Sequence, residues 1–234
     1  IFEDDDYIAI NKDIGIITHP TATNSGDSLV NALLYSGDIA DNGYEPDGYE
    51  YRPGVVHRLD KDTSGLILFA KNATAQSKLS ELFKTRQIEK LYIALVYGYL
   101  RENSGLITYP LGRSRNNRKI MSVTAAGKPA ITEFKVIGRK NNYTLLELNL
   151  KTGRTHQIRA HLKAIRHPVV GDNLSGNSEQ QIRLMLHSYS VGFLHPLNKT
   201  VIKLIAPLKT EFAEFLNRNG FDISEYKIEN QPAN

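Results

Sequence analysis

The chain has 234 residues, 41% hydrophobic and 23% charged, which excludes a disordered or fibrous protein and predicts a soluble globular one. It has no cysteine, which excludes a disulfide framework and a thiolate metal site and fits a reducing compartment, so we expect the cytoplasm. No apolar run approaches the roughly 20 residues needed to cross a bilayer. The net charge of +4 is only mildly basic, so it permits binding to a polyanion but does not by itself indicate it.

Alternation, caps and glycine punctuation predict the elements of the first half of the chain. In order, they are strands at 7–11 and 15–19, a helix capped by Asp27, a loop over 37–54, a strand at 66–70, a helix capped by Asn72 and a strand at 91–97. The last strand is apolar at nearly every position, which predicts that both of its faces are covered.

The second half adds more strands than helices. We predict a hairpin of strands 130–137 and 143–150 across Asn141–Asn142, a helix capped by Thr155 that ends near Ile165, strands at 184–194 and 201–205, and a last helix that ends at Gly220. Short turns join several strands, which favours an α+β fold with a mixed, largely antiparallel sheet over a regular βαβ series. One compact domain over 1–234, with two halves around a cleft, is the expected organisation.

The most informative segment is 57–65, His-Arg-Leu-Asp-Lys-Asp-Thr-Ser-Gly, which directly precedes the strand at 66–70. Ionised groups beside a core must be paired, so a loop this rich in charge indicates a functional site. Asp60 can act as nucleophile, general base, metal ligand or ion-pair partner, and its type alone does not choose among them. Asp62 is a potential acid/base companion, but nothing in a loop determines the separation of the two carboxylates.

Two later segments carry further candidates. Tyr92 lies in the apolar strand, where its ring can pack on a base and its phenol can transfer a proton, or where it is simply a core tyrosine. Arg159 lies in the helix after Thr155, where a guanidinium can hold a carboxylate ionised or can point to solvent.

These segments resemble the HRLD-x-x-TSG, K-x-Y-x-A-x-V-x-G and TGRTHQIR-x-H motifs of the large-ribosomal-subunit type of RNA pseudouridine synthases (the RluA family), and the resemblance covers about residues 3–215. It implies the pseudouridine synthase fold, with two halves around a central active-site cleft. It also implies that Asp60 is the catalytic nucleophile, that Tyr92 lies beside it as base or proton relay, and that Arg159 pairs with it. Many members have an N-terminal S4-type RNA-binding domain that this chain lacks. Because the chain begins with Ile1, we expect it to be a fragment.

The resemblance also implies contacts with RNA. Arg58 beside the nucleophile can fill the stack that a flipped base vacates, and a basic loop follows Gly112. The residues expected to bind substrate are His57, Arg58, Arg113, Arg115, Arg118, Lys119 and Lys128. A solvated surface is the alternative for the loop cations.

The implied activity is the isomerisation of specific uridines to pseudouridine in structured rRNA or tRNA, by base flipping. Two alternatives stay open: another glycosyl-bond enzyme, such as a nucleosidase or glycosidase using Asp60 with Asp62, and a non-catalytic RNA-binding module. We expect no organic cofactor, because the reaction is an internal rearrangement, and no metal, because His156 and His161 do not share a helical face. RNA is the expected partner, with no membrane, and a monomer is expected.

Overall fold

The computed structural model describes residues 1–20, 28–41, 52–114, 120–175 and 182–224. In chain order its strands are β1 (Phe2–Glu3), β2 (Tyr7–Lys12), β3 (Ser64–Ala70), β4 (Glu89–Tyr97), β5 (Ser104–Ile107), β6 (Leu111–Arg113), β7 (Met121–Val123), β8 (Thr132–Lys140), β9 (Tyr143–Leu150), β10 (Leu186–Leu194) and β11 (Val201–Ile205). Its helices are α1 (Leu29–Ser36), α2 (Ala73–Lys84), α3 (Gln157–Ala164) and α4 (Thr210–Arg218), with one 3-10 turn at Asn173–Ser175.

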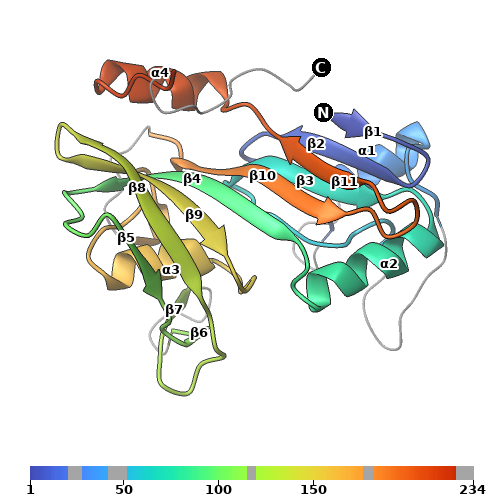
Figure 1. Ribbon diagram of the computed structural model, residues 1–234, viewed down its shortest axis with the longest axis horizontal. Coiled ribbons are helices and arrows are strands. Elements are labelled where there is room, and N and C mark those ends of the chain that lie inside the picture. The colour runs from blue at the N-terminus through green and yellow to red at the C-terminus, as the bar shows by residue number, and fades with distance from the viewer. Residues whose placement is uncertain (21–27, 42–51, 115–119, 176–181, 225–234) are drawn as a thin grey trace.

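Within these ranges, one nine-stranded sheet has the order β1-β2-β3-β10-β4-β9-β8-β5, and β11 also pairs with β10. The β3–β10 pair is parallel and the other neighbours are antiparallel. Figure 1 shows this sheet running across the molecule, with α2 and α3 below it in the view and α4 above it. The predicted α+β fold with a mixed, largely antiparallel sheet is confirmed.

Several local predictions are confirmed by hydrogen bonds. Asn72 caps α2 by accepting the backbone N–H of Ala75. The β8–β9 hairpin turns at Asn141 and Asn142, both with positive φ, as a two-residue hairpin turn requires.

Other caps differ from the predictions. Asp27 lies outside the described residues, and Ser28 caps α1. Thr155 does not cap α3. The helix entry is instead held by the Gln157 side chain, whose Oε1 accepts from Arg154 N and whose Nε2 donates to the Thr132 hydroxyl of β8. The last helix ends at Arg218, slightly before the predicted Gly220.

The strand predicted at 15–19 is absent. This segment makes only an isolated bridge between Ile17 and Ser28. The backbone turns at Gly15, which has a φ of 81°, and the buried Lys12 Nζ donates to the carbonyl oxygens of Asp13, Ile16 and Lys61. Those contacts bend the backbone into a turn, so a tertiary interaction overrides the local β propensity.

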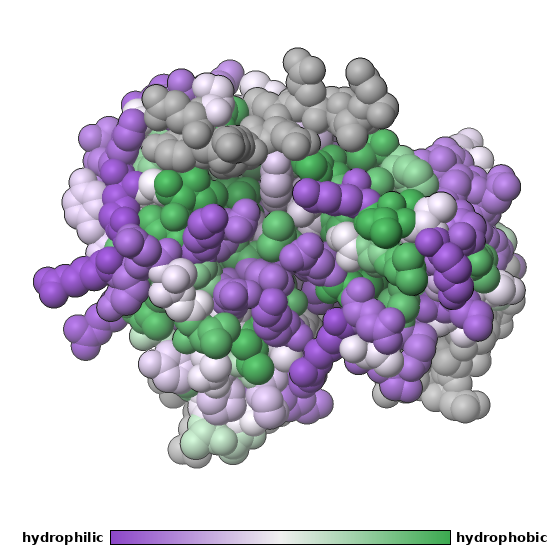
Figure 2. Space-filling view, in the orientation of Figure 1, coloured by the Kyte–Doolittle hydropathy of each residue, from purple (hydrophilic) through white to green (hydrophobic). Residues whose placement is uncertain are grey.

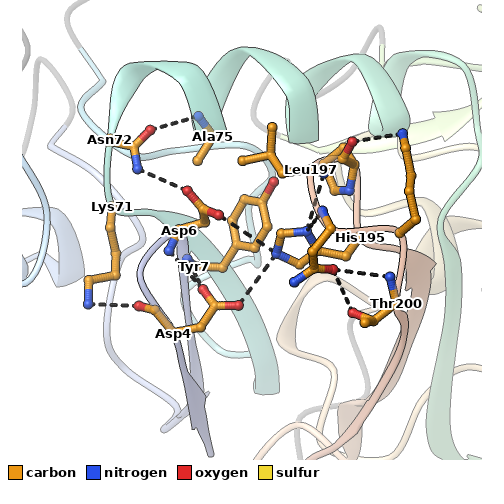
Figure 3. Close-up of polar contacts among 12 residues, drawn as sticks. Asp4, Asp6, Tyr7, Lys71, Asn72, Ala75, His195, Leu197 and Thr200 are labelled. Atoms are coloured by element: carbon orange, nitrogen blue, oxygen red, sulfur yellow. Dashed lines mark hydrogen bonds and ion pairs between the residues drawn. The ribbon is translucent and has the colours of Figure 1, made fainter.

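A buried histidine joins the N-terminal strands to the β10–β11 turn (Figure 3). His195 Nδ1 accepts the backbone N–H groups of Leu197 and Asn198, and its Nε2 lies 3.4 Å from Asp4 Oδ2. Its ring also packs on that of Tyr7, with centroids 4.9 Å apart. These contacts join β1 and β2 to the turn that follows β10.

The middle of the sheet is the core, and all seven residues of β3 are buried. The face drawn in Figure 2 carries hydrophilic side chains along its middle, between hydrophobic patches on either side. No helix in the described part of the chain is long and apolar enough to cross a membrane.

Candidate active site

Strand register brings the candidate segments together at β10. Ser188 of β10 lies opposite Tyr92 of β4 on one side and opposite Gly65 of β3 on the other. Gly65 has a φ of +109°, and a Cβ there would lie 2.2 Å from Ser188 O, so only glycine permits this close pairing. The loop that ends at Gly65 is therefore held one strand away from Tyr92.

Asp60, Tyr92 and Arg159 all line one cleft of about 320 Å³. Its walls come from the loop before β3, the start of β4, the end of β9 and the entry of α3, and the residues that line it are Val56, His57, Arg58, Leu59, Asp60, Thr63, Phe83, Lys90, Tyr92, Leu150, Gly153, Arg154, Thr155, His156, Gln157, Ile158, Arg159 and Leu186. Side chains about 100 positions apart in sequence therefore face the same space.

The loop that carries Asp60 is fastened on both sides. The Thr18 hydroxyl donates to Leu59 O and accepts from Leu59 N, and Lys12 donates to Lys61 O. A turn closes from Thr63 N to Asp60 O. The carboxylate itself stays partly open, with 19% of its side chain exposed.

The predicted ion pair between Arg159 and Asp60 is corrected by the structure. Arg159 Nη2 donates to Asp172 Oδ1, which also accepts from Leu174 N. Asp172 is 1% exposed, so its charge needs a partner more than that of Asp60, which is 19% exposed. Among the described residues, Asp60 instead faces His156, whose Nε2 lies 3.8 Å from Asp60 Oδ2.

Tyr92 is protonated at neutral pH. Burial raises the pKa of its phenol to about 12, the charge of Asp60 adds to the rise, and a hydrogen bond with Ser188 opposes it. A direct base would have to be a phenolate, so this environment favours a relay, in which the hydroxyl passes on its own proton as it takes another.

His57 forms a wall of the cleft. Its Nε2 accepts the Leu68 N–H of β3, and its ring stacks on Phe83 with centroids 4.6 Å apart. Burial, aided by the charge of Lys90, lowers the pKa of His57 to about 3, so the ring is neutral. His57 therefore lines the cleft as a neutral ring, not as a charge.

The sequence matches the family model described as RNA pseudouridylate synthase over residues 6–164. The chain belongs to the RNA pseudouridylate synthase family. It is 38% identical to ribosomal large subunit pseudouridine synthase D of Haemophilus ducreyi, over 97% of this chain and 72% of that protein. It is also 38% identical to an uncharacterised RNA pseudouridine synthase of Bacillus subtilis, over 94% of this chain and 73% of that protein.

Solved structures agree. Human RNA pseudouridylate synthase domain containing 1 is similar with a TM-score of 0.70 and 25% identity, over 89% of this chain and 82% of that one. Human RNA pseudouridylate synthase domain containing 4 shares the fold, with a TM-score of 0.72 and 23% identity, over 93% of this chain and 91% of that one. The protein is thus an enzyme that isomerises uridine to pseudouridine in RNA, and neither another glycosyl-bond enzyme nor a non-catalytic module is favoured.

The cations predicted to bind RNA lie in different places on the synthase. Arg58 is exposed and lines the cleft. Arg113, at the end of β6, and Lys128, which follows β7, are exposed at the β6–β7 hairpin, which projects beyond α3 in Figure 1. The remaining three predicted cations, Arg115, Arg118 and Lys119, lie outside the described residues.

Sequence reasoning did not select Lys90, Arg154 and His156, which also line the cleft. Burial lowers the pKa of Lys90, with Arg86 adding to the effect. Lys90 and His156 lie inside the motifs used to find Tyr92 and Arg159, so motif position was an available signal. Over the described ranges, no group of three or more His, Cys, Asp or Glu side chains is arranged to hold a metal ion.

Proposed function

We propose that this synthase modifies uridines of large-subunit ribosomal RNA. The two Haemophilus relatives that match nearly the whole chain are named for the ribosomal large subunit, which supports rRNA over tRNA. The target base is stacked within the RNA, so it must flip into the enzyme at a cost of a few kcal/mol, roughly. A cleft of about 320 Å³ suits a single flipped nucleotide.

The convergence of Asp60, Tyr92 and Arg159 on one cleft carries the proposal. Asp60 captures the sugar as the bond to the ring nitrogen breaks, and uracil then rotates and rejoins through carbon 5. The proton lost from carbon 5 is balanced by one gained at the released ring nitrogen, so no atom enters or leaves. The same carboxylate can serve direct attack on the sugar, addition to the base ring or a glycal route.

The other side chains assist this chemistry. Tyr92 relays the carbon 5 proton, since its raised pKa keeps the phenol protonated. Arg159, held by Asp172, keeps its guanidinium in a fixed position in the wall of the cleft that Asp60 lines. Arg58 fills the stack left by the flipped base, and Arg113 and Lys128 contact phosphates.

Tritium release from carbon-5-labelled ribosomal RNA tests the assignment of Asp60. Asp60→Asn and Asp60→Ala should release no tritium above background, because neither side chain can attack the sugar. Asp62→Asn is the matched control, since Asp62 is exposed, does not line the cleft and should retain activity within about twofold of wild type.

The outcomes separate the candidate activities. Tritium release by Asp60→Ala would refute Asp60 as the nucleophile. Free uracil as the product, together with inactivity of Asp62→Asn, would instead indicate a glycosidase that uses both carboxylates. Parallel assays on transfer RNA distinguish the two RNA classes.

A further inference from the structure

His156 has a backbone conformation that residues with side chains seldom adopt. Its φ of 51° and ψ of 24° are left-handed, at the position just before α3. A helix N-cap residue normally has an extended backbone and a side chain that accepts a helix N–H, and His156 has neither. Capping therefore does not explain it, and a strained conformation beside a cleft indicates a functional constraint.

The imidazole of His156 faces the proposed nucleophile. Its Nε2 lies 3.8 Å from Asp60 Oδ2, while its Nδ1 is buried and has no hydrogen-bond partner in the part of the chain that is described. The Nε2–H tautomer places a donor next to the carboxylate and leaves only a lone pair unmatched at Nδ1. The other tautomer would bury an unpaired N–H and turn a lone pair toward a negative charge, so the Nε2–H form is favoured.

Four charged groups surround the ring. Burial, the largest effect, lowers the pKa of His156; Asp60 and Asp172 oppose this, and Arg159 and Arg58 reinforce it. The ring is therefore neutral at neutral pH. A neutral donor can orient a carboxylate without neutralising its charge, whereas an imidazolium would compete with the sugar for it.

We propose that His156 is a positioning residue for Asp60, and that the left-handed turn before α3 exists to aim its Nε2–H at that carboxylate. The inference rests on the proposed function of Asp60. It assigns to the α3 entry the task of holding a nucleophile that lies in a different loop.

Two substitutions separate the side chain from the backbone. Glycine and asparagine both accept left-handed φ, so His156→Gly and His156→Asn should fold with an unchanged or higher Tm. If His156 positions Asp60, both should lower kcat about tenfold or more while KM for RNA stays within about twofold. A residue needed only for chain geometry would give full kcat in both variants.

Lys199→Gly is the matched control. Lys199 also has a left-handed φ, of 62°, and is exposed in the β10–β11 turn, away from the residues that line the cleft. Its replacement should leave kcat unchanged while relieving the same kind of backbone strain.

Two further measurements distinguish a positioning role of His156 from a purely structural one. Added imidazole should raise kcat of His156→Gly several-fold and should do nothing for Asp60→Asn. In the full chain, NMR titration should give His156 a lower pKa in Asp60→Asn than in wild type, because the charge of Asp60 raises it.

The outcomes are distinguishable. Full kcat in His156→Gly, or a low kcat that imidazole does not raise, would overturn the inference and leave the proposed function intact. A wild type that releases no tritium would overturn the proposed function itself. If both His156 variants failed to fold, the NMR titration would decide, and an unchanged pKa would refute the contact.

Discussion

At the scale of single residues, the two carboxylates Asp60 and Asp172 have different partners. The buried Asp172 takes the guanidinium of Arg159, and the more open Asp60 is left with the neutral His156. This arrangement leaves the proposed nucleophile without a direct salt bridge to Arg159. Arg159 then acts through its position and its charge, because its side chain is only 7% exposed and held on one side.

A double-mutant cycle tests the Arg159–Asp172 pair. Asp172→Asn should lower the free energy of unfolding by about 3 kcal/mol, because it leaves a buried guanidinium without its counter-charge. Arg159→Gln should cost a similar amount, and the double variant should cost much less than the sum. Urea unfolding of the three variants measures this, and tritium release should fall with Asp172→Asn.

The exposed pair Lys151–Glu133 provides the control for that cycle. Its side chains are 46% and 48% exposed with the charges 3.0 Å apart, so solvent screens their attraction. The same cycle there should give a coupling of about 0.5 kcal/mol or less. Similar coupling at the two pairs would show that burial does not strengthen the Arg159–Asp172 contact.

At the scale of elements, the end of β2 supports the loop that carries Asp60. Lys12 is 1% exposed, and its three carbonyl contacts join the turn after β2 to Lys61, next to the proposed nucleophile Asp60. Burial lowers the pKa of Lys12 to about 8, while Asp62 and Asp60 oppose this. The lysine is thus still mostly charged at pH 7 and replaces its lost water with backbone acceptors.

Lys12→Met should therefore weaken the loop and the fold together. Loss of the buried hydrogen bonds should lower the free energy of unfolding by about 1–3 kcal/mol. Displacement of Asp60 should lower kcat about tenfold. Lys209→Met is the comparison, because Lys209 holds the same turn through Asn11 O and Asp13 without touching Lys61. Urea unfolding measures the stability of both variants, and tritium release measures their kcat. An equal loss of kcat in the two variants would refute the link through Lys61.

The same elements show what the sequence could predict. The long strands and the Asn72 cap carry strong local signals, so these elements could be located from the sequence. Asp60, Tyr92 and Arg159 lie in distinctive motifs, so these residues could be located as well. The partner of Arg159 could not, because Asp172 is 13 residues away and meets it only through the folded turn after α3. Likewise, the segment 15–19 has strand composition, and its turn depends on tertiary contacts of the buried Lys12 amine and of Gly15 N with Lys61 O.

At the scale of the whole molecule, buried neutral histidines make the free energy of unfolding depend on pH, and His57 and His187 have the largest pKa shifts among them. Burial is the main cause that lowers the pKa of His57 to about 3 and that of His187 to about 3. His187 bridges the strands at the sheet centre, where Ser64 contacts its Nδ1 and Ala206 O its Nε2. Both rings therefore stay unprotonated in the folded state well below the pH at which an unfolded histidine takes up a proton.

The sign of the pH dependence follows from that difference. Between about pH 6.5 and pH 3 the unfolded chain binds protons at these two sites that the folded chain refuses, so the free energy of unfolding should fall as pH falls through this window. Each histidine contributes a slope of up to about 1.4 kcal/mol per pH unit. Urea unfolding at pH 7, 6 and 5 measures how steeply the free energy of unfolding falls with pH. His187→Gln should be less stable at pH 7, and its slope should be smaller than that of wild type by up to about 1.4 kcal/mol per pH unit. A free energy of unfolding that stays constant from pH 6.5 to 5 would mean that neither ring is held neutral by the fold.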